Sequence, residues 1–467
     1  MLLVEAIGQF LLAFGLTFLG VAVLGLFLWK PAINLWTDAF VKRLLKDPYP
    51  ENIGEMYNVF AKVGVRNVLE ADLRGNSGGP LERPFGSPLH FSNWDRLMLN
   101  PVYLSRLPVN EAVAIDTQVT IGPFAERPLT IAIPILIAGM GYGFGPSYQA
   151  KLALARAADQ VNTATNTGVG PLLPEERKNV KRLILQYHRG QWSKDPKVLR
   201  QADMIEIQLG YGALGSAPVD LPTAHISPEF RKFMNLKPGE GLKLSAQFPD
   251  MHNGAELIEL VQNLKKISNG VPVGVKLGAT HWLERELEII TAAPVDFLAI
   301  DGAEAGINFG PAILADDVGL PTLPALCRTV EFLRQKQLKD RISVIVSGGM
   351  VTPGQVLKAL ALGADAVYMG TVLMIVLAHR QITAAIPWEP PTELVYERGK
   401  LKDKLSIEDG AESVANFLKS CREEMILAMR SLGRTSIKEL SRDDLCAIHP
   451  ETARITGVES GLFPPGK

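Results

Sequence analysis

The sequence predicts an α/β protein: a (β/α)8 TIM barrel with an N-terminal transmembrane helix and a C-terminal helical appendage. Three observations lead to this prediction. The chain opens with a long apolar run, eight short apolar runs alternate with amphipathic stretches from about residue 130, and the last part has helical periodicity. With 467 residues, 47% of them hydrophobic and 21% charged, the chain can form one large barrel with appendages.

The first element, residues 1–30, is predicted to be a membrane anchor. From Ala6 to Trp29 the chain is almost wholly apolar, and roughly 24 residues at ~1.5 Å each span a bilayer core. Glu5 precedes the run and no convincing small-residue cleavage site follows it, which favours an anchor over a signal peptide. A buried soluble helix is the third interpretation, and it would need a core on all sides.

Basic residues follow the apolar run and none precedes it; they are Lys30, Lys42, Arg43 and Lys46. By the positive-inside rule, this asymmetry predicts a single-pass membrane protein whose catalytic domain is cytoplasmic. The three cysteines, Cys327, Cys421 and Cys446, are too sparse for a disulfide framework and agree with that compartment. A net charge of -1 without a basic stripe gives no reason to expect a nucleic-acid partner.

Residues 31–130 are predicted to be an extension packed on the barrel, because this part is rich in Pro, Gly and Asn and has few apolar stretches. The barrel itself is expected at 131–385. Its eight predicted strands are Ile131 to Ala138, Val161 to Asn166, Met204 to Gly210, Leu242 to Ala246, Val271 to Gly278, Val295 to Asp301, Ile342 to Ser347 and Ala366 to Gly370.

Helical periodicity connects most of these strands, for example over Gly254 to Ile267, Trp282 to Thr291, Leu323 to Gln335 and Pro353 to Leu362. Such repeated β-then-α units favour a parallel barrel, with an open doubly wound sheet as the alternative. Residues 386–467 are predicted to be the helical appendage, mainly through the stretch from Glu412 to Arg442.

A phosphate site is expected where the last two strands end. Ser347, Gly348 and Gly349 close the seventh strand, and Gly370 and Thr371 close the eighth. Small residues let backbone N–H groups approach an anion, and barrels often bind phosphate at this place. Ordinary turn chemistry is the alternative for either strand end alone.

Several motifs in a fixed order resemble the flavin-binding domain of glutamate synthase, over roughly residues 85 to 447. They are Ile342 to Met350 with Gly354 to Thr371, Ala138 to Gly143, Asn166 to Gly168, Val275 to Leu277, Asp301 to Gly306, and Leu432 to Leu440. The resemblance implies an FMN cofactor above the barrel mouth. It places the phosphate near the two strand ends just described and the flavin ring over Ala138, Gly139, Met140 and Gly141, with Asn166 also at the cofactor.

The resemblance also implies that Lys276 approaches the flavin where a cation stabilises the reduced ring. A lone lysine inside the apolar run Val-Gly-Val-Lys-Leu-Gly is costly to bury without an anionic partner, which agrees; a lysine reaching solvent from a strand end is the alternative. Glu304 and Tyr211 are the other predicted catalytic residues, because both lie in motifs that frame the flavin in the family.

The sequence departs from that family in two places. The region from Val372 to Pro387, where the family carries the cysteines of an iron-sulfur cluster, has no cysteine. In the family's 2-oxoglutarate pocket a Gln, a Lys and an acidic residue are expected, whereas this chain has Tyr211, Leu214 and Val169. Losing a cation that pairs with a carboxylate, and gaining an apolar residue, weakens binding of a dicarboxylate.

The expected function is therefore an FMN-dependent oxidoreductase with a small-molecule substrate other than 2-oxoglutarate, without a cluster and without a metal. Its electrons would come from a nicotinamide, from an electron-donor protein such as ferredoxin, or from a membrane quinone. Two alternatives stay open: a catalytically silent membrane scaffold in a redox complex, and a non-redox flavoenzyme.

Overall fold

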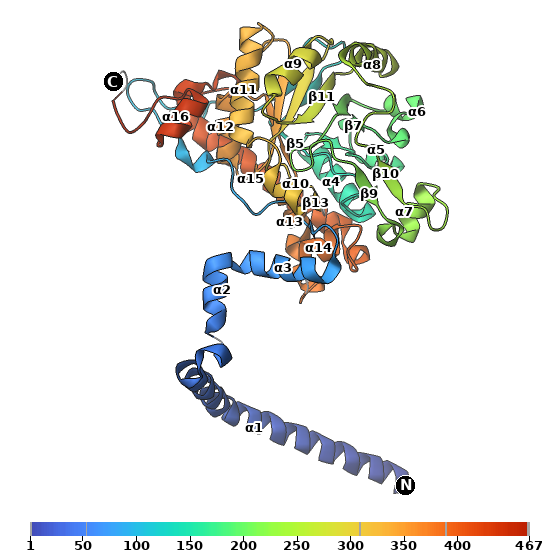
Figure 1. The fold of residues 1–467 in the computed structure, drawn as a ribbon, viewed down its shortest axis with the longest axis vertical. Helices are drawn as coiled ribbons and strands as arrows, with labels where there is room; N and C mark the ends of the chain where they lie inside the picture. Colours follow the sequence, from blue (N-terminus) through green and yellow to red (C-terminus); the bar gives the residue numbers. More distant parts are fainter. Residues whose placement is uncertain (1, 53, 308–309, 388–389, 465–467) are drawn as a thin grey trace. The chain divides into compact units, whose positions relative to one another are not determined.

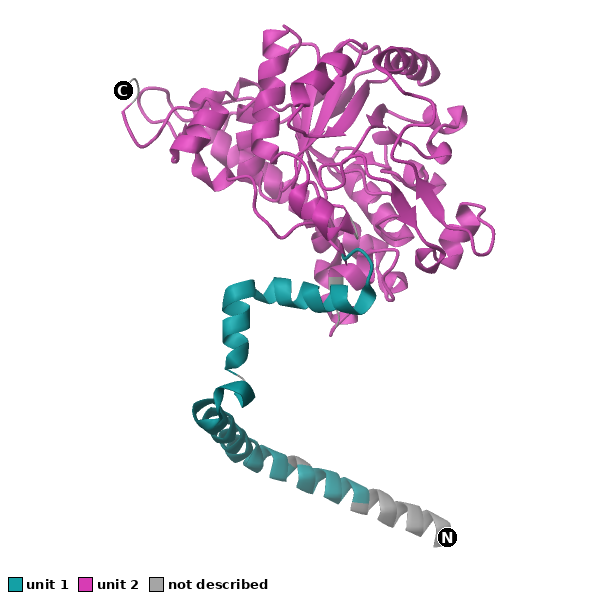
Figure 2. Ribbon diagram, in the orientation of Figure 1, with its two compact units in different colours: residues 1–81 teal, residues 82–467 magenta. Residues whose placement is uncertain are grey.

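The computed structural model describes residues 2–52, 54–307, 310–387 and 390–464 (Figure 1). The chain divides into two compact units, residues 1–81 and 82–467 (Figure 2). The boundaries expected at residues 130 and 385 both fall inside the second unit; as functional divisions they stay predictions.

The first unit is helical. Helix α1 (Leu2–Lys46) contains the predicted span and continues past Pro31, and it is followed by α2 (Glu55–Val63) and α3 (Val65–Ser77). Within α1, residues Phe14–Lys46 are long and apolar enough to cross a membrane, by length and composition only. The same test is passed by signal sequences near an N-terminus, so the membrane crossing stays a prediction.

The second unit is built on an eight-stranded parallel sheet in which spatial order follows chain order and the last strand pairs with the first. Its strands are β5 (Ile135–Ile137), β6 (Thr165–Asn166), β7 (Leu183–Tyr187), β8 (Met204–Gln208), β11 (Val273–Gly278), β12 (Phe297–Asp301), β14 (Ser343–Ser347) and β15 (Ala366–Met369). Between β6 and β5, the Ile137 N–H donates to the Ala164 carbonyl at 3.0 Å. The barrel is therefore nearly closed, and the open-sheet alternative is wrong.

One predicted barrel strand was wrong and another was missed. Leu242 to Ala246 is not in the barrel: β10 (Leu242–Leu244) pairs antiparallel with β9 (Val219–Leu221). Its middle residue Lys243 is exposed, as in a half-buried hairpin, whereas β7 is buried along its whole length and is the true third strand. Met204 to Gly210 consequently contains the fourth strand.

The predicted connecting helices all form, with ends that differ by at most one residue: α8 (Gly254–Ile267), α9 (Leu283–Thr291), α11 (Thr322–Gln335) and α12 (Pro353–Ala361). The other helices of this unit are α4 (Tyr148–Gln160), α5 (Pro174–Lys178), α6 (Pro196–Leu199), α7 (Pro228–Phe233), α10 (Ala312–Asp317), α13 (Thr371–Ala378), α14 (Pro390–Val395), α15 (Ile407–Ser431) and α16 (Pro450–Thr456).

A hairpin covers the amino ends of the barrel strands. It consists of β3 (Val119–Ile121) and β4 (Leu129–Ile131), whose isoleucines are fully buried. The Gly122 N–H at its turn donates to the Ser343 hydroxyl at the start of β14, at 3.1 Å. Because this end is covered, the carboxyl ends of the strands are left to form a site.

The C-terminal helix differs from its prediction. Instead of running from Glu412 to Arg442, α15 ends at Ser431, and it packs on α4 and α13 as part of the barrel's outer layer. Beyond it, β16 (Leu445–Ala447) pairs with β2 (Leu97–Leu99), and β1 (Glu82–Arg83) pairs with β13 (Gly310–Pro311).

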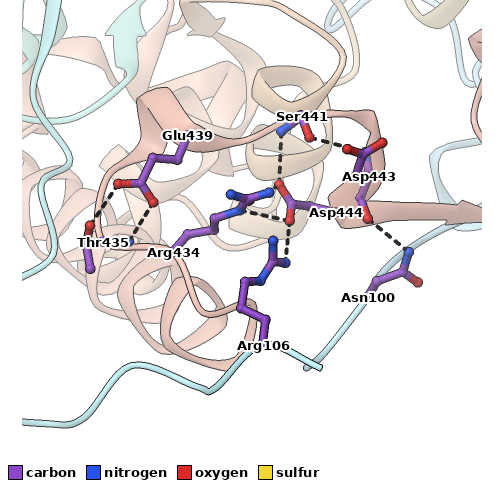
Figure 3. Close-up of polar contacts among 8 residues, drawn as sticks. All are labelled: Asn100, Arg106, Arg434, Thr435, Glu439, Ser441, Asp443 and Asp444. Carbon is purple, nitrogen blue, oxygen red and sulfur yellow. Dashed lines mark hydrogen bonds and ion pairs between the residues drawn. The ribbon is translucent and has the colours of Figure 1, made fainter. Parts of the chain in front are cut away.

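A buried carboxylate joins this tail to the segment before the barrel (Figure 3). Asp444 is fully buried and accepts hydrogen bonds from Arg106 at 2.8 Å, from Arg434 at 3.0 Å and from the Ser441 N–H at 3.0 Å. Arg434 belongs to the tail motif noted in the sequence, so that motif has a structural role here.

Candidate active site

A group of polar side chains fills the carboxyl end of the barrel, and we call it the mouth cluster. All its members are buried, and they come from six different strands: Asn166, Gln186, Glu206, Gln208, Lys276, Asp301 and Tyr368. Strand interiors with this many polar residues are unusual because each unpaired polar group costs free energy. The cluster is therefore the first candidate for a functional site.

Glu206 is the acceptor at its centre. One carboxylate oxygen accepts from the Asn166 amide at 2.9 Å and from the Gln186 amide at 2.8 Å. The other accepts from the Tyr368 hydroxyl at 2.7 Å. Charge-assisted bonds of this kind hold the four side chains in one arrangement.

Lys276 is the cation of the cluster. Its ammonium lies 3.2 Å from an Asp301 carboxylate oxygen and 4.9 Å from the centre of the Tyr368 ring. Burial alone lowers the pKa of Lys276, but the negative charges of Asp301 and Glu206 outweigh burial and hold its pKa above the usual value. Lys276 thus stays charged and buried, with Asp301 as its anionic partner in the chain, while its approach to the flavin stays a prediction.

Burial is also the largest cause that raises the pKa of Asp301, and Lys276 acts against it. Two carboxylates and one ammonium therefore share a small buried volume. Such an arrangement favours a ligand that presents hydrogen-bonding groups to it.

Unpaired polar atoms show where that ligand would be held. Both side-chain polar atoms of Gln208 are buried without a partner among the described residues, and so is one oxygen of Gln186. Gln208 is the register partner of Lys276 on the adjacent strand. A planar heterocycle with several donors and acceptors, such as the flavin of FMN, fits this edge.

The backbone at the predicted phosphate end is one that requires glycine. Gly348 has φ +123° and Gly349 φ +68°, and a Cβ atom at Gly348 would lie 2.4 Å from the Thr322 hydroxyl. A Cβ at Gly370 would lie 3.4 Å from that of Ala138. The first-strand loop and the eighth-strand end, with Thr371 starting α13, thus lie side by side, while their binding of FMN stays a prediction.

The first and second loops are in backbone contact. A Cβ atom at Gly141 would lie 2.3 Å from the Gly170 nitrogen, and one at Gly168 would lie 2.5 Å from the Gly141 nitrogen. A Cβ at Gly139 would lie 3.0 Å from the Asn166 side-chain oxygen. Loop packing therefore accounts for Gly141, and Gly139 lies next to Asn166 and Gln186 of the mouth cluster, while the place of Ala138, Gly139 and Met140 along the flavin ring stays a prediction.

Glu304 and Tyr211 lie at the rim. One Glu304 oxygen accepts from the Thr322 N–H at 2.8 Å and from its hydroxyl at 2.6 Å, and the other is buried without a partner among the described residues. Tyr211 is partly buried in a tight loop closed by Gly215, and burial raises the pKa of its phenol while the charge of Arg189 opposes this. In the part of the chain that the structure describes, neither side chain forms a hydrogen bond with Lys276.

Four mouth-cluster residues were missed in the sequence: Gln186, Glu206, Gln208 and Tyr368. A signal was available, because Met204-Ile-Glu-Ile-Gln208 places polar residues inside an apolar strand as Lys276 is placed in its own. For Gln186 the strand itself was missed.

A family model described as the conserved region in glutamate synthase matches residues 104–435. The glutamate synthase large subunit-like protein of Rhizobium meliloti (strain 1021) is 30% identical over 396 residues, which cover 80% of this chain and 89% of that protein. The archaeal glutamate synthase [NADPH] of Archaeoglobus fulgidus is 32% identical over 315 residues, or 66% of this chain and 61% of that protein.

Solved structures agree on the fold. A flavocytochrome b2 variant with sulfite bound has a TM-score of 0.50 at 15% identity, covering 80% of each chain. A chimera of (S)-mandelate dehydrogenase has the same TM-score and identity, covering 80% of this chain and 94% of the other. With the family model matched over most of the barrel unit, the chain belongs to the glutamate synthase family, and its barrel is an FMN-binding barrel.

Proposed function

We propose that this chain is an FMN-dependent oxidoreductase that acts on a small molecule other than 2-oxoglutarate and works without an iron-sulfur cluster. The observation that carries the proposal is Lys276, a buried cation held by Asp301 next to the unpaired Gln208. FMN supplies the group that exchanges an electron pair with the substrate.

The residues proposed to hold the cofactor divide into two sets. Ser347, Gly348, Gly349, Gly370 and Thr371 form the phosphate end, with N–H groups at the start of α13. In the second set, Lys276 provides positive charge where the reduced flavin ring would be negative. Glu206 holds Asn166, Gln186 and Tyr368 in place through its hydrogen bonds. Ala138, Gly139 and Met140 are proposed to lie along the ring.

The substrate proposal depends on what replaces the family's charged pocket. Val169 and Leu214 are buried apolar residues in the loops that follow the second and fourth strands. An apolar wall at these places disfavours a second carboxylate, because a desolvated carboxylate needs a cation or hydrogen-bond donors. Tyr211 and Glu304 are proposed to contact the substrate from the rim.

The electron donor is proposed to be a nicotinamide, a protein such as ferredoxin, or a quinone. The region from Val372 to Pro387 has no cysteine to ligate a cluster. The apolar helix α1 supports a membrane-tethered enzyme that a quinone in the bilayer would reach. The basic residues that follow the apolar run support a cytoplasmic barrel.

The test is a visible spectrum of the detergent-purified full chain before and after addition of NADPH or dithionite. We expect one FMN per chain that bleaches without cluster absorbance. In Lys276→Met, FMN should remain bound while its reduction slows by about 100-fold, because a preorganised charge is removed. Lys336→Met, an exposed lysine paired with Glu288 on the barrel's outside, is the matched control.

Two results would contradict the proposal. A colourless protein that cannot be reconstituted with FMN would favour the silent scaffold. Unchanged reduction in Lys276→Met would remove Lys276 from the catalytic set.

A further inference from the structure

Arg189 is a buried arginine just beyond the carboxyl end of β7, at the rim of the barrel mouth. Its side chain is only 4% exposed. One guanidinium nitrogen, Nη1, donates to the Ser216 carbonyl at 3.0 Å and to the Ala246 carbonyl at 3.2 Å. These bonds place the guanidinium between the loop after β8 and the chain after β10.

The other edge of the guanidinium is unpaired. Nε and Nη2 are both buried, and neither has an acceptor among the described residues. A buried charged group with two unmet donors is destabilising unless an acceptor binds there. Nε and Nη2 lie on the same edge of the planar fork, the edge that pairs with both oxygens of a carboxylate.

A neighbouring donor is unpaired as well. His188 is fully buried, and its Nδ1 accepts a hydrogen bond from the Gly190 N–H at 2.9 Å. A neutral imidazole that accepts at Nδ1 carries its proton on Nε2. That Nε2 is also buried without a partner among the described residues.

The loops of three consecutive strands meet around these donors. The Ser216 carbonyl belongs to the loop that carries Leu214 and Tyr211, after β8. The His188 ring packs on Trp192 with centres 5.3 Å apart, and the Trp192 indole donates to the Val169 carbonyl after β6 at 2.8 Å. Apolar Val169 and Leu214 therefore belong to the same part of the mouth as Arg189.

We propose that Arg189 binds the carboxylate of the substrate through Nε and Nη2, and that the substrate is a small monocarboxylic acid whose remaining part contacts Val169 and Leu214. This inference rests on the proposed function, since it names the substrate class of the same site. Arg189 takes the carboxylate-binding role at the third strand end, and the apolar positions on either side exclude a second carboxylate.

The test uses the full-length holoprotein in detergent and follows the visible absorbance of its bound FMN during ligand titration. The probes are pyruvate, the methyl ester of pyruvate, 2-oxoglutarate and inorganic phosphate. We expect a saturable change with pyruvate, none with the ester, and at least about 10-fold weaker binding of 2-oxoglutarate and phosphate, because only pyruvate has one planar carboxylate with an uncharged remainder.

Variants then assign the effect to the guanidinium edge. In Arg189→Met the dissociation constant for pyruvate should rise at least about 30-fold, and in Arg189→Lys about 10-fold or more, because an ammonium cannot offer two parallel donors. The matched control is Arg182→Met, an arginine immediately before β7 at the opposite end of the strand, which should bind pyruvate as the wild type does.

Each other outcome overturns the inference. FMN-containing protein that no carboxylate perturbs, or Arg189→Lys with wild-type affinity for pyruvate, removes the carboxylate role while the proposed function stands. Equal binding of phosphate makes the site a general anion site. If both Arg189 variants lose FMN and melt early, Arg189 is only a structural link between loops. A wild type without FMN refutes the proposed function itself.

Discussion

His188 is a buried residue whose protonation state is set by its surroundings. Burial is the largest cause that lowers the pKa of its imidazole to about 3, and the charges of Arg189 and Lys194 act in the same direction. In the unfolded chain the imidazole titrates near its ordinary value of about 6.5. Between about pH 6.5 and pH 3, the His188 imidazole is therefore protonated in the unfolded state and neutral in the folded state.

This difference predicts an acid-sensitive part of the stability. As the pH falls from 7 to 5, His188 should cost the fold about 2 kcal/mol. We expect the free energy of unfolding, measured by denaturant titration at pH 7 and pH 5, to fall by about 2 kcal/mol less in His188→Gln than in the wild type. Identical pH slopes for the two proteins would show that His188 is not held neutral in the fold.

At the residue scale, the sequence could identify candidate functional residues whose burial inside an apolar strand is energetically costly. Lys276 stood out as a charge in an apolar strand, and the structure pairs it with Asp301. The same reasoning applied to Glu206 would have found the centre of the mouth cluster. That reasoning could not identify Arg189, because its role depends on hydrogen bonds to carbonyls that lie about 27 and 57 residues away in sequence.

At the scale of elements, Asp444 shows how the tail is held. It has no exposure and receives donors from Arg106 and Arg434, which lie on opposite sides of the barrel in the sequence. Removing its charge leaves two guanidinium groups without their shared anion. The tail and the segment before the barrel should then loosen together.

We expect Asp444→Asn to lower the free energy of unfolding by about 2 kcal/mol, measured by chemical denaturation. The neighbouring Asp443, which is exposed, offers a matched change: Asp443→Asn should be within about 0.5 kcal/mol of wild type. Equal effects of the two variants would mean that the buried ion pairs contribute nothing.

The sequence predicted the helices more accurately than the short strands. Helices with strong periodicity and clear ends, such as α8 and α12, were placed within one residue, and α12 begins with a capping box between Thr352 and Gln355. Short buried strands were harder, because an apolar run of a few residues has no periodicity of its own. The exchange of β7 for Leu242 to Ala246 arose in this way, since both are short segments rich in apolar residues, although Lys243 and Ser245 interrupt the second one.

At the scale of the whole molecule, the chain has two units with different properties. Residues 82–467 contain the barrel, the mouth cluster and the tail, while residues 1–81 contain the apolar helix α1. Hydropathy predicted α1, but whether a bilayer surrounds it depends on its cellular context and not on contacts within the chain.

A variant that begins at Glu82 should separate these properties. We expect it to stay in the supernatant after ultracentrifugation of a lysate and to carry the FMN spectrum, while the full chain sediments with membranes. Full-length protein in the supernatant would show that α1 is not an anchor. A truncated protein that sediments would place the membrane contact in the barrel unit instead.

The pairing of the last barrel strand with the first, β15 with β5, has a consequence for biosynthesis. Ala138 and Gly370 meet in the finished mouth, yet more than two hundred residues of synthesis separate them. The proposed phosphate end at Gly370 and Thr371 would be incomplete in a ribosome-bound chain that has not yet released its eighth strand. With the cofactor held as proposed, we expect FMN to bind only after Thr371 has emerged from the exit tunnel.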